Sequence, residues 1–295
     1  MIKVASREEM TLTCLLFTPV LKDGWASKAW RYHPDGVILD LEDSIPLNLK
    51  KEARESSRQI SSEPNLNWLI RINSYTSGVW KEDLRTALND NIVGILIPKV
   101  ESPLQIEEMA SFTSKLEAKE NRKSPKAFFI PIIESSKGVT NLVGISGASD
   151  RILTLAFGAA DFVNDMGFLS MPDRFAINSL KFRIAVVARA AGLKPPHDSP
   201  FFNIYDEKGL IEETLQAKAL AYGGKHAIHP LQVKVIKDLF KVDEDELREA
   251  KKVVKEFEEA NMKGIASVQV EGKMVDYPIY YRAKKLLEGE MKNER

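Results

Sequence analysis

Five short apolar runs recur along this chain, and each ends in a charged or amide residue or in a glycine turn. They are Gly36–Asp43, Trp68–Asn73, Gly94–Lys99, Phe129–Glu134 and Ile152–Asp161. A strand of a parallel sheet that is covered on both faces reads as a nearly continuous apolar run. Where such strands alternate with helices in a closed barrel, the side chains at their carboxyl ends surround one pocket. The pattern therefore predicts a single site that is built from many strands and is rich in carboxylates and cations.

The apolar runs alternate with amphipathic stretches over most of the chain. We expect strands near 12–18, 36–41, 68–73, 94–98, 127–133, 152–157, 194–198 and 225–229. We expect helices between them near 23–31, 47–60, 80–88, 103–118, 138–146, 173–191 and 207–221. Alternating strand and helix units predict a parallel sheet with right-handed crossovers. About eight units in a chain of this length favour a closed (β/α)₈ TIM barrel, although the weak run at 194–198 leaves seven strands as an alternative.

The pattern changes after residue 240. A long charged helix is expected over 243–262, followed by a hairpin with strands near 266–270 and 273–275 and a last helix from about Pro278. The sequence therefore indicates a TIM-barrel catalytic domain over residues 1–240 and a C-terminal extension over residues 241–295.

Composition excludes some classes of partner. The chain has 42 Lys and Arg residues and 42 Asp and Glu residues, so its formal net charge is zero and nothing favours nucleic acid or an anionic membrane. No apolar run approaches the roughly 20 residues of a membrane span, and no signal-peptide pattern is present, so we expect a cytoplasmic protein. The one cysteine, Cys14, lies in an apolar run, which predicts a buried and inert thiol.

Glu134 and Asp161 are the first candidates for chemistry, because each follows an apolar strand and the two strands are consecutive. Carboxylates at neighbouring strand ends can reach one hard cation, and Mg²⁺ usually takes one or two protein carboxylates plus water and substrate oxygens. The alternative is that each acid caps the helix after its strand. Gly158 favours a site, since a glycine lets the backbone approach a ligand closely.

Arg71 interrupts an otherwise apolar strand, so its charge requires an anion. That anion is either a structural carboxylate or the carboxylate of a substrate, and we favour the substrate. Asp40, Glu42 and Asp43 crowd another strand end, where alternation would place Asp40 and Glu42 on one side and Asp43 on the other. Three like charges so close together require a cation, which a bound metal and Arg71 would supply.

Lys99 ends another apolar run, where it could form a Schiff base, orient a substrate or pair with Glu101. The metal-type carboxylates count against the Schiff base, because a metal and an imine solve the same problem of stabilising an enolate. For His229, at the end of the last expected strand, a structural role is favoured over that of a base. The remaining histidines fit no pattern and receive no role: His33, His197 and His226.

Together these segments resemble the citrate lyase β-subunit-like group of the HpcH/HpaI aldolase superfamily, which includes malyl-CoA, citramalyl-CoA and citryl-CoA lyases. The resemblance covers nearly the whole chain, and its pieces follow the family order with family-like spacing. The matching pieces are Leu16–Pro19, Ile38–Pro46, Arg71–Asn73, Leu96–Glu101, Ile133–Glu134, Ala156–Asp161, Ala188–Leu193 and Gly224–Pro230.

The resemblance implies that Glu134 and Asp161 bind Mg²⁺, with Mn²⁺ as an alternative ion. It implies that Arg71 holds the carboxylate of a 2-keto acid such as glyoxylate, pyruvate or oxaloacetate. Two further groups of residues are implied: Gly158, Ala159, Ala160 and Lys99 for substrate binding, the first three through backbone amides, and Asp40, Glu42 and Asp43 for catalytic support of metal-bound water.

Residues 271–278 resemble the segment that, in the CoA lyases, folds over the barrel of a neighbouring subunit. Asp276 matches the family's acid/base residue, which is supplied in trans, so the resemblance implies a homo-oligomer, a trimer or a hexamer. The alternative is that Asp276 is a turn residue of a packing arm. Val20 stands where relatives carry a glycine in a loop that helps to hold CoA, and this departure favours a substrate without CoA.

The function implied is that of a Mg²⁺-dependent lyase that cleaves a carbon–carbon bond of a 3-hydroxyacyl-CoA thioester such as malyl-, citramalyl- or citryl-CoA. The products would be a 2-keto acid and an acyl-CoA, so the CoA thioester is a substrate rather than a bound cofactor. Four alternatives stay open. They are a citrate lyase β subunit acting on citryl-acyl carrier protein, a malyl-CoA thioesterase, a metal-dependent aldolase acting on free 2-keto acids, and a non-catalytic homologue that binds a dicarboxylate or a partner.

Overall fold

The chain forms two units in the computed structural model, which describes residues 12–62, 66–119, 126–169 and 172–293. The main segments of the two units meet between Phe240 and Lys241. Residues 1–11 of the predicted barrel domain lie outside the described residues.

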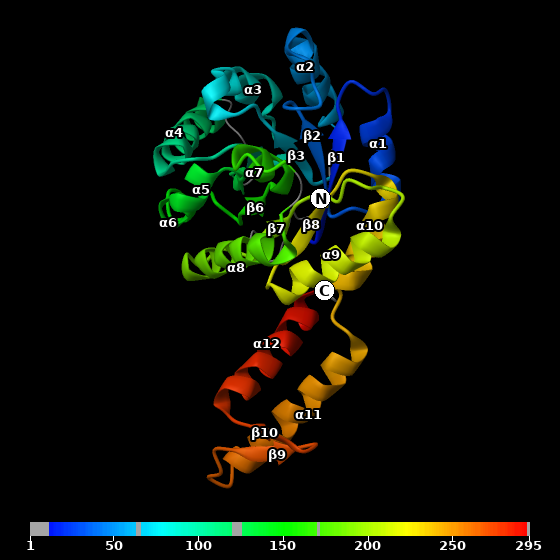
Figure 1. The fold of residues 1–295 in the computed structure, drawn as a ribbon, viewed down its shortest axis with the longest axis vertical. Helices are drawn as coiled ribbons and strands as arrows, with labels where there is room; N and C mark the ends of the chain where they lie inside the picture. Colours follow the sequence, from blue (N-terminus) through cyan, green and yellow to red (C-terminus); the bar gives the residue numbers. More distant parts are fainter. Residues whose placement is uncertain (1–11, 63–65, 120–125, 170–171, 294–295) are drawn as a thin grey trace. The chain divides into compact units, whose positions relative to one another are not determined.

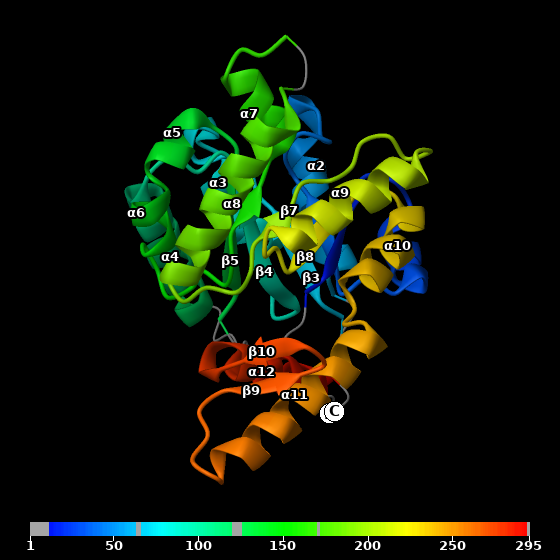
Figure 2. The ribbon, with the colours of Figure 1, turned by 60° about the horizontal axis from the view of Figure 1, so that its bottom comes forward.

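Within the described residues, eight parallel strands close into a barrel in sequence order, and the last strand pairs with the first (Figure 1, Figure 2). The strands are β1 (Cys14–Pro19), β2 (Gly36–Asp40), β3 (Trp68–Arg71), β4 (Ile92–Ile97), β5 (Phe128–Ile133), β6 (Ala156–Phe157), β7 (His197–Asp198) and β8 (Gly224–Ala227). The predicted (β/α)₈ TIM barrel is therefore confirmed, with eight strands rather than seven.

Helices surround these strands and complete the βα units. They are α1 (Trp25–Ala29), α2 (Lys50–Ile60), α3 (Trp80–Ala87), α4 (Pro103–Lys119), α5 (Ser136–Thr140), α6 (Leu142–Ser146), α7 (Ala159–Asp165), α8 (Arg174–Ala190), α9 (Glu207–Ala219) and α10 (Pro230–Phe240). Short 3₁₀ turns cover Trp30–Tyr32, Leu47–Leu49 and Tyr75–Ser77. The sequence pattern does not predict α7 or α10, and the helix expected over 138–146 is broken at Asn141, whose side chain donates to the carbonyl of Glu101 at 2.7 Å.

The side chains inside the barrel are apolar along most of the strands and become polar at the carboxyl ends of the strands. Side chains two apart on a strand share a face, so Gly36 lies on the same face as Asp40, and Leu69 on the same face as Arg71. A Cβ on Gly36 would lie 2.5 Å from Cδ1 of Leu69, so a glycine is required there for the leucine to fill the interior. The polar pair Asp40 and Arg71 follows at the carboxyl ends of the same strands, which is where the site is found.

The second unit consists of two helices and a hairpin, α11 (Glu244–Asn261), β9 (Val268–Val270), β10 (Lys273–Val275) and α12 (Tyr277–Asn293). The two strands pair in antiparallel fashion. Phe257 of α11 stacks on Tyr280 of α12, and Val270 and Val275 of the hairpin complete a small apolar core. This order of elements matches the sequence prediction, whereas packing of the unit on a neighbouring subunit stays a prediction.

Two expectations about the chain as a whole concern membranes and the thiol. Nowhere in the described residues does a helix combine the length and the apolar character that crossing a membrane requires. Cys14 is fully buried in β1, and this burial raises the pKa of its thiol, which confirms the predicted buried position.

Candidate active site

Asp40 and Arg71 form a fixed pair at the ends of β2 and β3. Nε and Nη2 of Arg71 each donate to one oxygen of Asp40 at 2.7 Å. The amides of Glu42 and Ser44 also donate to Asp40, at 3.0 and 3.2 Å. Burial alone would raise the pKa of Asp40, but the hydrogen bonds and the charge of Arg71 outweigh it and lower that pKa below its usual value. Two of the three guanidinium nitrogens therefore bind a structural carboxylate, which is the alternative that the sequence left open.

The third nitrogen of Arg71 faces two more acids. Its Nη1 lies 3.3 Å from Oε2 of Glu42 and 3.8 Å from Oδ2 of Asp43. The guanidinium also lies over the ring of Phe17, 4.8 Å from its centroid. The expectation that Asp43 lies opposite Asp40 and Glu42 is wrong, because β2 ends at Asp40 and strand alternation does not extend to residue 43.

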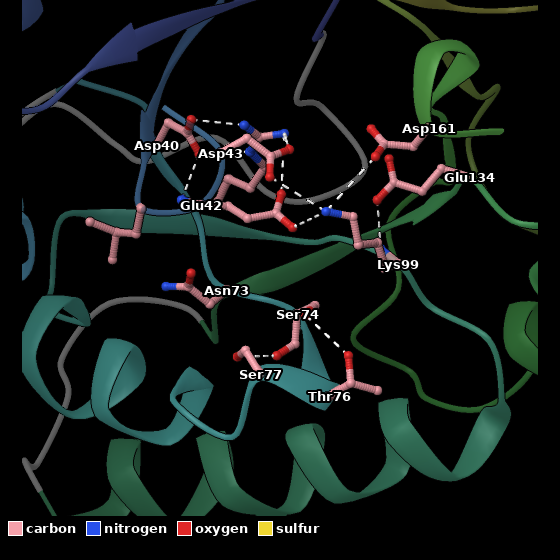
Figure 3. A network of polar contacts seen from close by, with 12 residues as sticks. Asp40, Glu42, Asp43, Asn73, Ser74, Thr76, Ser77, Lys99, Glu134 and Asp161 are labelled. Atoms are coloured by element: carbon pink, nitrogen blue, oxygen red, sulfur yellow. Dashed lines mark hydrogen bonds and ion pairs between the residues drawn. The ribbon is translucent and has the colours of Figure 1, made fainter. Parts of the chain in front are cut away.

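Lys99 lies just after β4, between the acids that follow β2 and those that follow β5 and β6 (Figure 3). Its Nζ lies 2.9 Å from Glu42, 3.4 Å from Asp43 and 3.8 Å from Asp161, while its backbone amide donates to Glu134 at 2.6 Å. Partial burial acts to lower the pKa of Lys99, but the hydrogen bond and the charge of Glu42 outweigh it and raise that pKa. A Schiff base requires a neutral amine, so the ion pairs favour the orienting role.

Glu101, the other partner considered for Lys99, pairs instead with Lys137 at 3.2 Å.

Glu134 follows β5 and is only 4% exposed. It does not cap the next helix, because Ser135 is the N-cap of α5 and its hydroxyl accepts from the amide of Gly138. Burial, and then the charges of Asp161 and Glu42, raise the pKa of Glu134 to about 8. A Cβ on Gly158 would lie 2.2 Å from Oε2 of Glu134, so the glycine is needed to make room for this carboxylate.

Asp161 lies in the first turn of α7, where Gly158 is the N-cap. Asp161 therefore does not cap the helix, and its side chain is 40% exposed. With Glu134 it offers two hard oxygen donors at adjacent strand ends, which suits Mg²⁺. In the described part of the chain, no group of three or more His, Cys, Asp or Glu side chains is arranged to hold a metal ion.

The turn between β6 and α7 was expected to offer the backbone amides of Gly158, Ala159 and Ala160 to a ligand, but two of these amides already have partners. The amide of Gly158 donates to the carbonyl of Ile133 at 3.0 Å, and the amide of Ala159 donates to Oγ of Ser199 at 2.9 Å. Ala160 lies in the first turn of α7, where amides have no partner within the helix. A ligand oxygen would therefore meet the amide of Ala160 more readily than those of Gly158 and Ala159.

A cavity of about 330 Å³ joins these groups at the carboxyl ends of the strands. Most of the predicted site residues line it: Asp43, Arg71, Glu134, Gly158, Ala159, Ala160 and Asp161. Asp40, Glu42 and Lys99 contact Arg71, Asp43 or Asp161 without lining the cavity. The volume is at the lower end of the range of about 300–1,000 Å³ that is usual for ligand sites, and it suits a small acid.

Phe17, Ser199 and His226 are among the cavity residues to which the sequence prediction gives no role. The ring of His226 lies 5.4 Å from that of His197, and both are buried. Burial lowers the pKa of His197 to about 4 and that of His226 well below its usual value, so both are neutral. Nδ1 of His197 and Nε2 of His226 have no hydrogen-bond partner among the described residues.

Nδ1 of His229 accepts from the amide of Leu231 at the start of α10, at 3.3 Å, and the structural role of His229 stays a prediction. Asp276 belongs to the second unit and follows β10 directly. Its side chain accepts from the amide of Ile279 at 3.4 Å, at the start of α12. This contact is the one expected of a turn residue, and the role of Asp276 in a neighbouring subunit stays a prediction.

A parallel barrel with carboxylates and an arginine around one pocket at its strand ends is the architecture of a TIM-barrel enzyme. A sequence profile of the HpcH/HpaI aldolase/citrate lyase family matches residues 13–230. The chain belongs to this family, as its motifs predict, and it is an enzyme of the lyase class.

Individual relatives agree with this assignment. The chain is 30% identical over 276 residues to the citrate lyase subunit beta of Leuconostoc mesenteroides subsp. cremoris, covering 92% of this chain and 91% of the relative. It is 29% identical over 268 residues to the mitochondrial citramalyl-CoA lyase of Rattus norvegicus, covering 86% and 78%. The crystal structure of CitE from Mycobacterium tuberculosis in complex with magnesium, acetoacetate and coenzyme A superposes with a TM-score of 0.78 at 25% identity, covering 95% and 98%.

Proposed function

We propose that this enzyme is a Mg²⁺-dependent carbon–carbon lyase. Its substrate would be a 3-hydroxyacyl-CoA thioester such as malyl-, citramalyl- or citryl-CoA, and its products a 2-keto acid and an acyl-CoA. The observation that carries the proposal is the convergence of Glu134, Asp161 and Arg71 on one cavity. The similarity to a citramalyl-CoA lyase, and to a CitE structure that holds magnesium, acetoacetate and coenzyme A, supports this class of substrate.

The side chains present fit Mg²⁺, with Mn²⁺ as an alternative ion. Glu134 and Asp161 are hard oxygen donors, and one or two protein carboxylates are what Mg²⁺ usually takes. Burial, and then the charges of Asp161 and Glu42, raise the pKa of Glu134, and a cation bound beside this carboxylate would oppose these effects. When bound there, Mg²⁺ would polarise the substrate hydroxyl oxygen that becomes the ketone oxygen.

Arg71 and Ala160 would orient the keto acid end of the substrate. Asp40 fixes the plane of the guanidinium through Nε and Nη2, and a substrate carboxylate would share Nη1 of Arg71 with Glu42 and Asp43. The amide of Ala160 is placed to donate to a second ligand oxygen. Lys99 would hold Glu42, Asp43 and Asp161 in place.

Proton transfer to and from the acyl thioester would fall to Asp276 of a neighbouring subunit in a homo-oligomer, a trimer or a hexamer. A carboxylate is a suitable base for the methyl group of an acetyl thioester in the synthetic direction. The family resemblance of residues 271–278 supports this role.

The proposal is tested by incubating the protein and Mg²⁺ with malyl-, citramalyl- and citryl-CoA, while free keto acid and free thiol are measured separately. Keto acid without thiol is expected. Thiol without keto acid would indicate a thioesterase, and cleavage of free 4-hydroxy-2-keto acids alone would refute a CoA substrate. Glu134→Gln should abolish cleavage, whereas Glu101→Gln, which removes only the surface pair with Lys137, should not.

A second candidate is a citrate lyase β subunit that acts on citryl-acyl carrier protein. The similarity to the Leuconostoc citrate lyase subunit beta favours it. The two candidates are separated by comparing kcat/KM for citryl-CoA with that for citryl-acyl carrier protein. A preference of 100-fold or more for the carrier protein would establish the second candidate.

A further inference from the structure

A single serine closes the turn that carries Asp161. Ser199 follows β7 and is 4% exposed. Its Oγ accepts from the amide of Ala159 at 2.9 Å and donates to the carbonyl of Phe157 at 2.8 Å. One hydroxyl therefore joins the last residue of β6 to the first residue of α7, across Gly158.

Ser199 is itself held by a group of charged side chains, of which Asp198, Lys181 and Lys225 are buried and Glu213 is partly exposed. Nζ of Lys225 donates to the carbonyl of Ser199 at 2.6 Å, to Asp198 at 2.8 Å and to Glu213. The other oxygen of Asp198 pairs with Lys181 at 2.8 Å. Two lysines and two carboxylates balance one another, so no isolated charge is buried and the group can act as a rigid support.

The turn has little freedom to move without disturbing the site. A Cβ on Gly158 would already lie 2.2 Å from Oε2 of Glu134, so the backbone of the turn is in close contact with that carboxylate. Asp161 lies only three residues further on, in the first turn of α7. A small rotation of the turn would therefore move Asp161 relative to Glu134.

We propose that Ser199, held by Lys225, is a positioning residue that sets the geometry of the two metal-binding carboxylates and of the Ala160 amide. The inference rests on the proposed function and extends it to a residue whose hydroxyl binds the backbone of the turn, and to the ion pairs that hold this residue. Ser199→Ala would leave the amide of Ala159 and the carbonyl of Phe157 without their shared partner. The turn would then relax, and the affinity for Mg²⁺ would fall.

The test is isothermal titration calorimetry of the full-length protein with Mg²⁺ alone and then with pyruvate in the presence of Mg²⁺. Ser199→Ala is expected to weaken Mg²⁺ binding about 10-fold, the size usual for residues that support metal ligands. Ser199→Thr retains the hydroxyl and should restore most of the affinity. Ser146→Ala is the matched control, because its buried hydroxyl donates to the carbonyl of Val143 in α6 and, within the described residues, to no group of the site.

Each outcome decides the question. Equal Mg²⁺ affinity in the wild type and Ser199→Ala would overturn the inference while leaving the proposed function intact. A lower melting temperature in Ser199→Ala without loss of Mg²⁺ affinity would show a role in stability alone and would also overturn it. A wild-type protein that binds no Mg²⁺ would refute the proposed function, and the inference with it.

Discussion

Glu134 and Glu42 hold a proton at pH values where exposed carboxylates are fully ionised. Burial, together with neighbouring acids, raises the pKa of Glu134 to about 8 and that of Glu42 to about 7. Burial is the main cause, and a local excess of acids adds to it, since five carboxylates meet two cations, namely Asp40, Glu42, Asp43, Glu134 and Asp161 against Arg71 and Lys99. A divalent cation would relieve this excess and favour the ionised forms.

Mg²⁺ binding should therefore depend on pH. Between the ordinary value of 4.5 and about 8, the folded metal-free protein holds a proton on Glu134 that Mg²⁺ must displace. We expect the affinity for Mg²⁺ to rise with pH through this window, by up to about tenfold per pH unit, and to level off above it. Calorimetry in buffers of different ionisation enthalpy should detect the released proton.

The free energy of unfolding of the metal-free protein should fall as the pH rises, whereas the affinity for Mg²⁺ rises. The folded state binds the extra proton between pH 4.5 and about 8, so raising the pH through this window destabilises the metal-free fold. Glu134→Gln removes the titrating group and should lessen both dependences. A Mg²⁺ affinity that stays constant from pH 6 to pH 9 would contradict the assignment of Glu134 as a ligand.

Charged residues of the site could be predicted from the sequence because a charge at the end of an apolar strand stands out. Phe17, Ser199 and His226 could not, because they are ordinary residues of a barrel core and their role depends on which strands are neighbours. Leu15 pairs with His226 across the closure of the barrel, and no local pattern reveals that register. Asp43 was misplaced for a related reason, since alternation holds only while the strand continues.

At the scale of elements, the longer strands could be predicted to within about two residues, whereas β6 and β7 have only two residues each. The apolar run 152–157 forms less sheet than its composition suggests. Thr154 in this run donates its hydroxyl to the carbonyls of Lys194 and Pro195, and Ile152 makes only an isolated bridge to Phe129. Such contacts with distant segments are not visible in a window of local sequence.

Arg151 provides a test of how the helices are fastened to the barrel. It is 2% exposed, and its guanidinium binds both oxygens of Glu117 on α4 as well as the carbonyl of Ala127 just before β5. Arg151→Met would remove the cation that binds both oxygens of this buried carboxylate. We expect a loss of about 3–5 kcal/mol in the free energy of unfolding, measured by urea denaturation.

Two further variants test whether the loss in free energy of unfolding comes from the charge left on Glu117 and from the burial of the ion pair. Adding Glu117→Gln to Arg151→Met should recover part of the loss, because the buried side chain that has lost Arg151 then carries no charge. Arg85→Met breaks an exposed pair with Glu82 and should cost less than about 1 kcal/mol. If Arg151→Met were no more costly than Arg85→Met, the buried pair would not be what holds α4 against the barrel.

At the scale of the whole molecule, the proposed metal and carboxylate ligands lie in one unit and Asp276 in the other. The alternation of strands and helices was enough to predict the barrel and to place its site at the carboxyl ends of the strands. It could not show whether Asp276 completes a site on another subunit, because that depends on a surface between chains rather than on any local pattern.

Mixing two inactive variants tests the role of Asp276 in trans. The Glu134→Gln variant lacks the proposed metal ligand in its barrel but keeps Asp276 in its second unit, which is called the arm here. The Asp276→Asn variant keeps Glu134 in its barrel but lacks the acid/base residue in its arm. If the arm serves a neighbouring subunit, random mixing at equal amounts should give roughly one quarter intact sites and a corresponding share of wild-type activity. If the arm serves its own barrel, no site is intact and activity stays at the level of the separate variants.

The control for this experiment mixes Asp276→Asn with the double variant Glu134→Gln/Asp276→Asn, which supplies no functional arm. No recovery is expected there. Recovery in the control would show that Asp276 is not required.

The pairing of β1 with β8, which closes the barrel, can form only late in the synthesis of the chain. Cys14 of β1 pairs with Lys225 of β8, so the last row of hydrogen bonds joins residues more than two hundred positions apart. Until β8 has left the ribosome, β1 has an open edge, and unpaired strand edges promote aggregation. That edge of β1 therefore stays unpaired for most of translation, and the main segment of the second unit, which begins at Lys241, emerges only after β8.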